Sequence, residues 1–193
     1  MLSLDSLIRE AEIAHGHLCA GQILGVRMAM LGLTKLGIED PRGKDRKRLI
    51  TFVEIDRCAT DAIGVVTGCR LGKRALKFRD WGKMAATFID LETGKAIRIA
   101  AKESSKKLAR EMHPEIDNKN QQQMLAYREM NEADLFSTQW VKVDLPAEEF
   151  PGYKGDRIVC AECGEGINFH REVERDGRIL CRACAGEKYY EAL

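Results

Sequence analysis

The chain lacks the features of a secreted, membrane-bound or nucleic-acid-binding protein. It has no long apolar run, and its first ten residues, MLSLDSLIRE, are charged by position 5, so neither a secretion signal nor a spanning helix is predicted. Neither sign of charge is in excess, because 31 Lys and Arg residues face 30 Asp and Glu residues. A bulk field that attracts DNA or anionic lipid is therefore excluded. We expect a cytoplasmic protein without a membrane partner, and nucleic acid is a disfavoured partner.

Proline is also scarce, since only 4 prolines interrupt 193 residues, and long regular elements are permitted. Hydrophobic residues make up 45% of the chain, which is enough for the core of one or two domains. Apolar spacing and turn residues predict an α+β protein. The expected helices are 4–14, capped by Ser3, then 21–36, 61–67, capped by Asp61, 104–112 and 118–130. The expected strands are 49–55, 76–79 and 83–90, joined by a Trp81–Gly82 turn, then 97–101 and 136–143.

Four of the seven cysteines form a pair of C-x2-C motifs separated by seventeen residues, Cys160, Cys163, Cys181 and Cys184. Without an export signal, cysteines are more often metal ligands or reactive thiols than disulfides. Two knuckles at this spacing close a tetrahedral thiolate shell around one zinc ion, as in a zinc ribbon. A pair of redox dithiols is the alternative, but such motifs usually occur singly. We predict bound Zn²⁺.

Pro and Gly interrupt the chain at 151–155, so we predict a core domain at 1–150 and the ribbon at 156–193. The ribbon carries six basic and eight acidic residues, and this net negative charge cannot drive DNA binding by counterion release. A unit of 38 residues is too small for apolar burial alone to hold a fold, so zinc should supply much of its folding energy. The predicted role of the ribbon is structural.

A second group of soft ligands lies near the amino end, where His15, His17 and Cys19 fall within five residues, and Cys58 follows the first predicted strand. If 15–19 is extended, all three side chains project to one side; if it is helical, His15 and Cys19 stack one turn apart. The start of the second helix would lower the pKa of Cys19 through the helix dipole. The alternative is that the cysteine is a small buried hydrophobe and the histidines are satisfied polar residues.

Three separated blocks of sequence resemble the FmdE family, which is named after the E component of formylmethanofuran dehydrogenase. They are His15-Gly-His-Leu-Cys-Ala-Gly-Gln-Ile-Leu-Gly-Val-Arg-Met-Ala29, Glu54-Ile-Asp-Arg-Cys58 with Asp61-Ala62, and Val66-Thr-Gly-Cys-Arg-Leu-Gly-Lys73. The resemblance covers about residues 10–145, and the C-terminal zinc ribbon is an appendage that many members share. Family members commonly have Pro at the position of Ala20 and Gly at that of Arg74. Neither departure removes a candidate ligand.

The resemblance implies a mixed sheet flanked by helices, a homodimer, and a cleft built from His17, Cys19 and Cys58, with His15, Asp61 and Cys69 nearby. It also implies association with the other components of a molybdenum or tungsten enzyme of C1 metabolism. The candidate catalytic residues are Cys19, Cys58, His17 and Asp61, and the candidate metal ligands are His15, His17, Cys19 and Cys58, which could hold a second transition metal or Zn²⁺.

Two functional hypotheses follow for the core site. The chain is either an accessory or catalytic component of a formylmethanofuran dehydrogenase-like oxidoreductase, or a metal carrier or sensor with a labile His/Cys site. The remaining cysteines show no iron–sulfur spacing, so under the first hypothesis another protein of the complex must handle electrons. A nucleic-acid-binding ribbon protein is a third, disfavoured class.

Overall fold

The computed structural model describes residues 2–191, so the outer ends of the two predicted domains, Met1, Ala192 and Leu193, lie outside the described residues. The structure divides into two compact units, Met1–Val143 and Asp144–Leu193, and each is described by itself. The predicted domain limits, 1–150 and 156–193, stay a prediction beside this division. Over the described chain, no helix has both the length and the apolar character needed to cross a bilayer.

The first unit is built on a five-stranded sheet with the order β2-β1-β3-β4-β5. Strands β1 and β2 are parallel, and the other neighbours are antiparallel. The sheet is therefore mixed, and the predicted α+β class is confirmed. The strands are β1 (Leu49–Val53), β2 (Leu76–Phe78), β3 (Ala85–Asp90), β4 (Ala96–Ala101) and β5 (Phe136–Val141).

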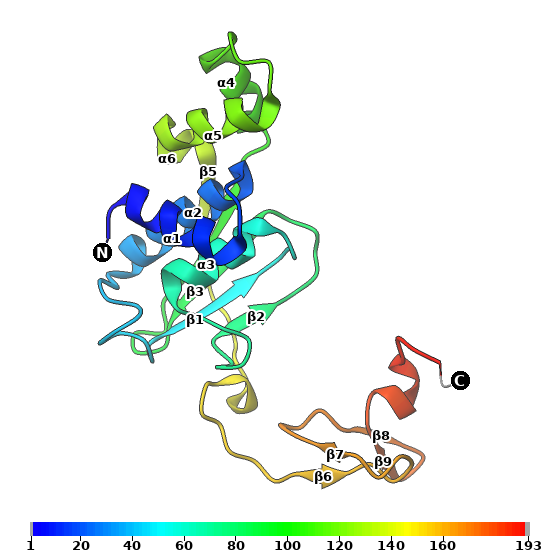
Figure 1. Ribbon diagram of the computed structural model, residues 1–193. Coiled ribbons are helices and arrows are strands. Elements are labelled where there is room, and N and C mark those ends of the chain that lie inside the picture. The colour runs from blue at the N-terminus through cyan, green and yellow to red at the C-terminus, as the bar shows by residue number, and fades with distance from the viewer. Residues whose placement is uncertain (1, 192–193) are drawn as a thin grey trace. The chain divides into compact units, whose positions relative to one another are not determined.

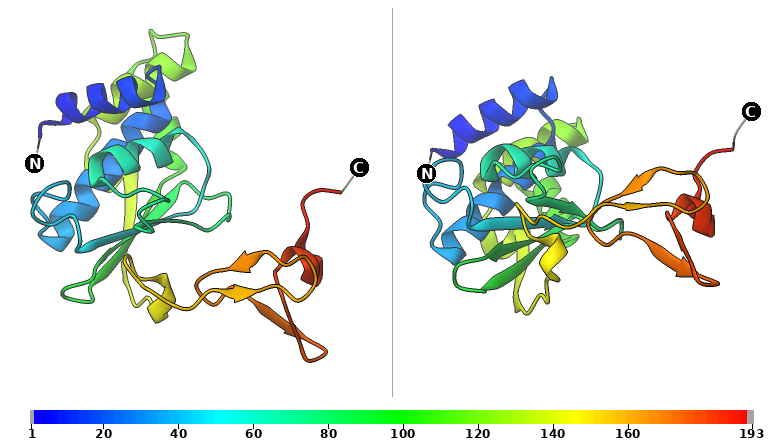
Figure 2. Two further views of the ribbon diagram at one scale, coloured as in Figure 1. Left: turned by 60° about the horizontal axis from the view of Figure 1, so that its bottom comes forward. Right: turned by 90° about the horizontal axis from the view of Figure 1, so that it is seen from below.

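Three helices, α1 (Leu4–His15), α2 (Ala20–Leu36) and α3 (Cys58–Thr67), lie on one side of this sheet (Figures 1 and 2). Helix α2 packs on β3 and β4 and against both other helices. The connection from β4 to β5 carries three more helices, of which α5 packs on α2. They are α4 (Ser104–Met112), α5 (Lys119–Glu129) and α6 (Glu132–Leu135).

Local sequence sets the helix ends that flank the candidate site. The Ser3 side chain accepts from the Ser6 amide at 3.2 Å and caps α1, as expected for a serine at this position. Gly16 then takes a left-handed conformation with φ of 92°, which ends the helix at little cost because glycine has no Cβ. Helix α2 starts at Ala20 and ends at the left-handed Gly37. The segment between α1 and α2 is therefore only four residues long.

Helices α2 and α3 approach each other through a glycine. A Cβ at Gly25 would lie 2.4 Å from the carbonyl oxygen of Ala59 and 2.9 Å from the Cβ of Ala62. Backbone contact this close is possible only where one helix lacks a side chain. Because the two helices touch near their amino ends, the residues that begin them are brought together.

Two local predictions were wrong. Asp61 does not cap α3, since the helix begins three residues earlier, with Arg57 in the capping position. Trp81 and Gly82 do not form a hairpin turn, because β1 lies between β2 and β3 in the sheet. Instead, the amides of Trp81 and Lys83 both donate to the Glu54 carbonyl, at 3.2 and 3.1 Å. This segment therefore crosses the end of β1, a pairing that local turn chemistry does not encode.

The two faces of the sheet differ. Val53, Phe88, Ile97 and Ile99 are buried in the cluster shared with the helices. The opposite face presents a cross-strand row in which Phe52 pairs with Thr87, Thr87 with Arg98, and Arg98 with Gln139. Side chains that stand opposite one another on neighbouring strands share a face, so this row mixes an aromatic ring with polar groups.

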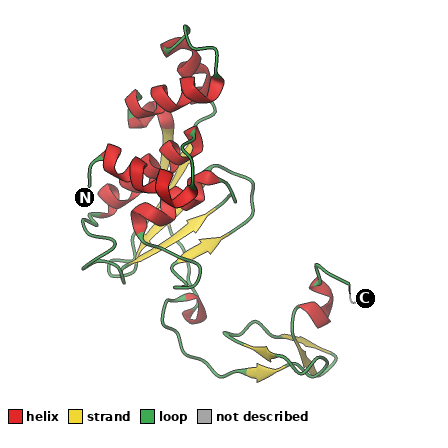
Figure 3. Cartoon of the chain, viewed as in Figure 1, coloured by secondary structure: helices red, strands yellow, loops and turns green. Residues whose placement is uncertain are grey.

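The second unit has little regular structure (Figure 3). The first cysteine pair lies between the strands of one short antiparallel hairpin, and the second pair follows another, with its last cysteine in a short helical segment, Ala183–Glu187. The buried cluster of this unit consists of Cys160, Ile167 and Leu180. The strands are β6 (Ile158–Val159), β7 (Gly166–Ile167), β8 (Val173–Arg175) and β9 (Arg178–Leu180), and a 3₁₀ turn spans Ala147–Glu149.

Candidate metal and thiol sites

The four ribbon cysteines converge on one point. Ligand atoms of Cys160, Cys163, Cys181 and Cys184 all lie within 4.8 Å of one another, and the sulfurs of Cys163 and Cys181 are 3.9 Å apart. Four thiolates around zinc, each about 2.3 Å from the ion, require sulfur separations of this size. The donor set therefore fits a structural zinc ion.

Backbone amides prepare these sulfurs for a cation. The Cys181 amide donates to the Cys160 sulfur at 3.2 Å, and the Cys184 amide donates to the Cys181 sulfur at 3.4 Å. Backbone hydrogen bonds from Cys163 and Cys181 lower the pKa of Cys160 to about 6. The neighbouring Cys181 thiol and burial raise the pKa of Cys184 far above its ordinary value. The protein alone stabilises one thiolate readily and opposes further ionisation, a conflict that a bound divalent cation removes.

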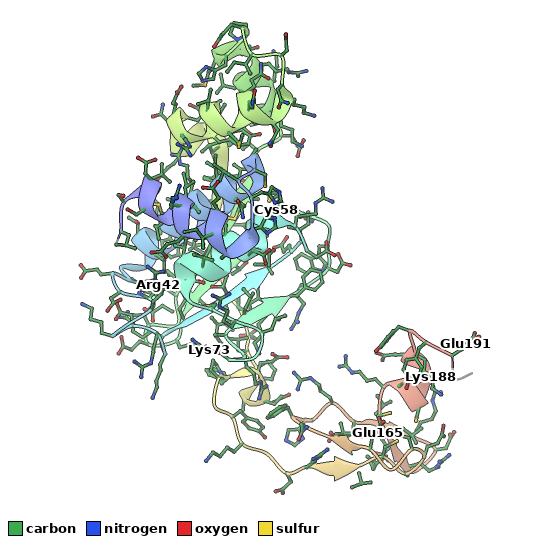
Figure 4. The ribbon with its side chains drawn as sticks, viewed as in Figure 1. Arg42, Cys58, Lys73, Glu165, Lys188 and Glu191 are labelled. Atoms are coloured by element: carbon green, nitrogen blue, oxygen red, sulfur yellow. The ribbon has the colours of Figure 1, made fainter. Side chains whose placement is uncertain are left out.

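The second thiol site lies where α2 and α3 begin. Cys19 is the N-cap of α2 and Cys58 is the first residue of α3, as Figure 4 shows for the labelled Cys58. The two thiols are hydrogen-bonding neighbours. A Cβ at Gly21 would lie 3.6 Å from the Cys58 Cβ and 3.7 Å from the Cys19 sulfur, so both side chains border the same small space. Thirty-eight residues of sequence separate them, and the packing of two helices brings them together.

The electrostatics of this pair differ from the expectation. The start of a helix was expected to favour a thiolate here, but burial and then the neighbouring Cys19 thiol raise the pKa of Cys58 above its ordinary value. Both cysteines are half-buried. Desolvation and like-charge repulsion therefore outweigh the helix N-terminus at Cys58, and without a cation this thiol stays protonated at neutral pH.

His15 is held by a carboxylate. Its Nδ1 lies 2.8 Å from Oδ2 of Asp61, and the histidine side chain is 18% exposed. Asp61 lies in the first turn of α3, so one helix supplies both Cys58 and the partner of His15. The ring of His17 lies 4.7 Å from that of His15, centroid to centroid. The predicted alternatives for 15–19 are both incomplete, since His15 ends a helix and Cys19 is extended.

A cavity of about 390 Å³ opens beside these groups. Its lining carries two carboxylates, from Asp56 and Asp61, and one guanidinium, from Arg57, so its charge is net negative at neutral pH. The cavity is lined by His15, Asp56, Arg57, Cys58, Thr60 and Asp61. A net negative pocket with a thiol and an imidazole on its wall favours a cation.

The structure brings the predicted residues together only in pairs. Within residues 2–191, the ribbon cysteines are the one group in which three or more metal-ligating side chains converge within 4.8 Å. Cys19 adjoins Cys58, and His15 adjoins Asp61 and His17.

Cys69 was expected near the cleft, but it lies beyond the opposite end of α3, about 15 Å along the helix axis from Cys58. There it is 3% exposed and contacts the Thr51 hydroxyl and the Leu49 carbonyl. This placement removes Cys69 from the candidate site.

One residue that positions the site was not predicted. Asn120, in α5, accepts a hydrogen bond from the Ala20 amide at 3.2 Å. It thereby satisfies one of the free amides at the start of α2 and fixes the turn that carries Cys19. The two residues are one hundred positions apart, and no local motif signals their contact.

Comparison with known families agrees with this architecture. Residues 14–137 match the family model described as FmdE, molybdenum formylmethanofuran dehydrogenase operon. The match covers more than half of the chain and includes every candidate ligand of the core. The chain belongs to the FmdE family. Residues 153–190 match a second model, the prokaryotic DksA/TraR C4-type zinc finger, in agreement with the four converging thiols.

Two individual proteins are similar over most of the chain. A probable S-adenosyl-L-methionine-binding protein of Archaeoglobus fulgidus is 32% identical over 208 aligned positions, which cover 96% of this chain and 54% of that protein. The chain thus spans about half the length of this curated relative. The crystal structure of an FmdE-like protein of tungsten formylmethanofuran dehydrogenase from Syntrophus aciditrophicus is similar with a TM-score of 0.67 and 21% identity. The match covers 98% of this chain and 96% of that one, and shows the fold.

Proposed function

We propose that this chain is an accessory or catalytic protein of FmdE type that acts with a molybdenum- or tungsten-dependent oxidoreductase of C1 metabolism. Its core site, in this proposal, binds a transition metal or Zn²⁺ through Cys19, Cys58 and a histidine. The observation that carries the proposal is the thiol pair at the start of α2 and α3, next to a histidine whose Nδ1 is held by Asp61.

The His15–Asp61 contact supports metal binding in particular. A neutral imidazole that donates its Nδ1 proton to a carboxylate keeps a lone pair on Nε2, and metal-bound histidines are usually oriented in this way. Two thiolates and an imidazole form a donor set that zinc prefers. Three protein ligands leave a coordination position for water or a small substrate.

The shell is incomplete in the structure, since no three of these side chains converge among the described residues. His17 is exposed and lies beside His15, so rotation of a histidine side chain is the movement that completes it. The net negative lining of the 390 Å³ cavity also favours cation entry.

The roles of the site residues follow from these contacts. Cys19 and Cys58 hold the ion, His15 or His17 completes the shell, and Asp61 orients His15 as a positioning residue. Arg57, at the wall of the cavity, offers a guanidinium to a small carboxylate substrate such as a C1 acid. A bound metal would supply Lewis-acid chemistry at the open position, and electrons would be handled by a partner protein.

A metal carrier or sensor is the second candidate, and the exposure of the ligands favours it. Cys19 and Cys58 are half-buried and His17 is exposed, which permits ligand exchange. Affinity purification from the native organism separates the two candidates. Recovery of a molybdenum or tungsten oxidoreductase supports the first, whereas rapid loss of the core metal to a mild chelator without such a partner supports the second.

The direct test is metal content per chain. We expect about two zinc equivalents in the wild type and about one in Cys19→Ser and in Cys58→Ser, with the ribbon still folded, because the two sets of ligands share no residue. Cys69→Ser is the matched control, since Cys69 is a third core thiol away from the site and should leave the content at two. If Cys19→Ser and Cys69→Ser bind the same amount of metal, the core thiols do not form a metal site.

The homodimer is part of the proposal as well. Sedimentation of the purified chain should give twice the mass of the monomer, and a monomer at micromolar concentration would contradict it.

A further inference from the structure

The face of the sheet opposite the helices contains a second, chemically different cavity of about 270 Å³. Its walls are aromatic and aliphatic, from Phe52, Trp81 and the two valines at the end of β5, Val141 and Val143. Arg98 and Thr87 lie among them. Apolar walls with a few placed polar groups are typical of small-molecule sites.

The charged group in this cavity is fixed before any ligand arrives. Arg98 donates through Nε and Nη2 to the two carboxylate oxygens of Glu54, each at 2.7 Å, and the Glu54 side chain is 3% exposed. A bidentate pair of this kind holds the guanidinium plane in one orientation. The hydrogen bond from Arg98 to Glu54 also raises the pKa of Arg98, so the cation persists at any physiological pH.

Two polar groups of the cavity have no protein partner. Within residues 2–191, neither Nη1 of Arg98 nor the hydroxyl of Thr87 makes a hydrogen bond to the protein. Thr87 is 7% exposed, and the two residues pair across β3 and β4 on this face. Nearly buried polar groups normally find partners. A donor pair of this kind suits an acceptor supplied from outside, such as a carboxylate.

The aromatic wall is also held in place. The backbone amides of Trp81 and Lys83 donate to the Glu54 carbonyl, so the residue that anchors Arg98 also anchors the indole. The guanidinium of Arg79 lies 5.1 Å from the centre of the Phe52 ring. Arg79 and Arg98 against Glu54 give the lining a net positive charge. Aromatic rings and a positive charge together favour a flat anion.

We propose that this cavity is a binding site for a small planar aromatic carboxylate, whose ring packs between Phe52 and Trp81 and whose carboxylate accepts from Arg98 and Thr87. The site is separate from the His/Cys site and does not rest on the proposed function. It shares no lining residue with the cavity at Cys58, and its lining is positive where that one is negative.

Benzoate is the probe, and intrinsic fluorescence is the readout. The chain has 2 tryptophans, Trp81 and Trp140, and only Trp81 lines the cavity. In Trp140→Phe, benzoate should quench the remaining fluorescence in a saturable way, with a matching heat of binding in calorimetry. Benzamide, which lacks the charge, and cyclohexanecarboxylate, which lacks the flat ring, should each bind about tenfold more weakly.

Two variants assign the binding to this cavity. Trp81→Ala removes a side chain that is 61% exposed, so the fold is kept, and benzoate affinity should fall about threefold to tenfold. Thr87→Val is nearly isosteric and should reduce it about tenfold. Arg98→Lys keeps a cation against Glu54 but removes the guanidinium fork, and should weaken benzoate more than benzamide.

The proposal is overturned if benzoate does not bind at millimolar concentration. It is also overturned if benzoate binds the wild type, Trp81→Ala and Thr87→Val equally, or no more tightly than benzamide does. Thermal unfolding of each variant shows that it is folded when tested.

Discussion

The ribbon and the core each gather thiols, but by opposite means. In the ribbon, four cysteines lie within 25 consecutive residues, and two short hairpins are enough to bring them together. In the core, Cys19 and Cys58 come from two helices that meet because Gly25 lets the backbones touch. The ribbon sulfurs converge as a set of four, whereas the core ligands meet in pairs. Metal should therefore be a requirement for folding in the ribbon and an addition to a finished fold in the core.

The buried clusters explain this difference. The ribbon has three buried residues in its own cluster, one of which is the ligand Cys160. The core cluster draws on all of α1–α3 and on four strands. A small unit without an apolar core depends on its metal for stability, and a large one does not.

The largest effect is expected from removal of a ribbon ligand. Cys181→Ser should abolish zinc binding and unfold the ribbon, because structural zinc contributes on the order of 10 kcal/mol to units of this kind. The core should be unaffected. Limited proteolysis and amide resonances of the ribbon provide the measurement, and Ala161→Ser, an exposed substitution beside a ligand, is the control. A ribbon that stays ordered in Cys181→Ser would remove the distinction between the two regions.

The next largest effect is expected where the helices that carry the core thiols touch. A Cβ at Gly25 would lie 2.4 Å from the Ala59 carbonyl oxygen, so Gly25→Ala should lower the free energy of unfolding by about 3 kcal/mol. It should also separate Cys19 from Cys58 and weaken metal binding in the core alone. Denaturant unfolding measures the first effect. Gly72→Ala, where a Cβ has nothing within 4 Å, should change stability by less than about 0.5 kcal/mol. Equal effects at Gly25 and Gly72 would contradict the close approach.

Acid should distinguish the regions through Asp90, whose side chain is fully buried. Burial raises the pKa of Asp90, but hydrogen bonds from Arg48, Thr93 and the Glu92 amide outweigh it and hold the pKa below 3.8. A depressed pKa stabilises the fold above the unfolded value, and this stability is lost as the pH falls through the folded value.

Asp90→Asn should therefore cost about 2 kcal/mol at pH 7 and flatten the pH dependence of core unfolding below about pH 4. Unfolding followed by Trp81 and Trp140 fluorescence measures this. The same substitution should leave zinc content unchanged. Glu92→Gln, at a side chain that is 67% exposed, is the control. An Asp90→Asn protein with an unaltered acid limb would show that the Arg48–Asp90 pair does not stabilise the core.

The smallest effect on stability is expected at the core metal site. Asp61 is 61% exposed, so Asp61→Asn should change unfolding by less than about 1 kcal/mol. Loss of the carboxylate that orients His15 should still weaken metal binding at the core about tenfold, as measured by competition with a chelator. Asp56→Asn, at the other carboxylate of the cavity, tests whether orientation or charge is responsible. Equal losses in both variants would assign the effect to charge.

Local sequence predicted most of the elements, because caps and glycines mark their ends. The helix 104–112 and the strand 136–143 agree with α4 and with β5 to within two residues, and the left-handed Gly16, Gly37 and Gly68 end the first three helices. The ribbon cysteines were predictable for the same reason, since all four belong to short-range motifs.

Features that depend on long-range packing were not predictable. The start of α3 at Cys58 follows from its packing on α2, whereas the local pattern favoured Asp61 as the cap. The contact of Asn120 with Ala20 and the Glu54–Arg98 pair join residues 100 and 44 positions apart. Proximity of Cys19 and Cys58 could be suggested by the family resemblance, but the pairing of His15 with Asp61 needed the structure.

The most direct test of a core metal site is anomalous scattering at the zinc edge from crystals grown without added metal. Two peaks per chain are expected, one among the four ribbon sulfurs and one between Cys19 and Cys58, with only the second absent in Cys19→Ser. A single ribbon peak in the wild type, with well-ordered but unliganded Cys19 and Cys58, would contradict metal binding by the core.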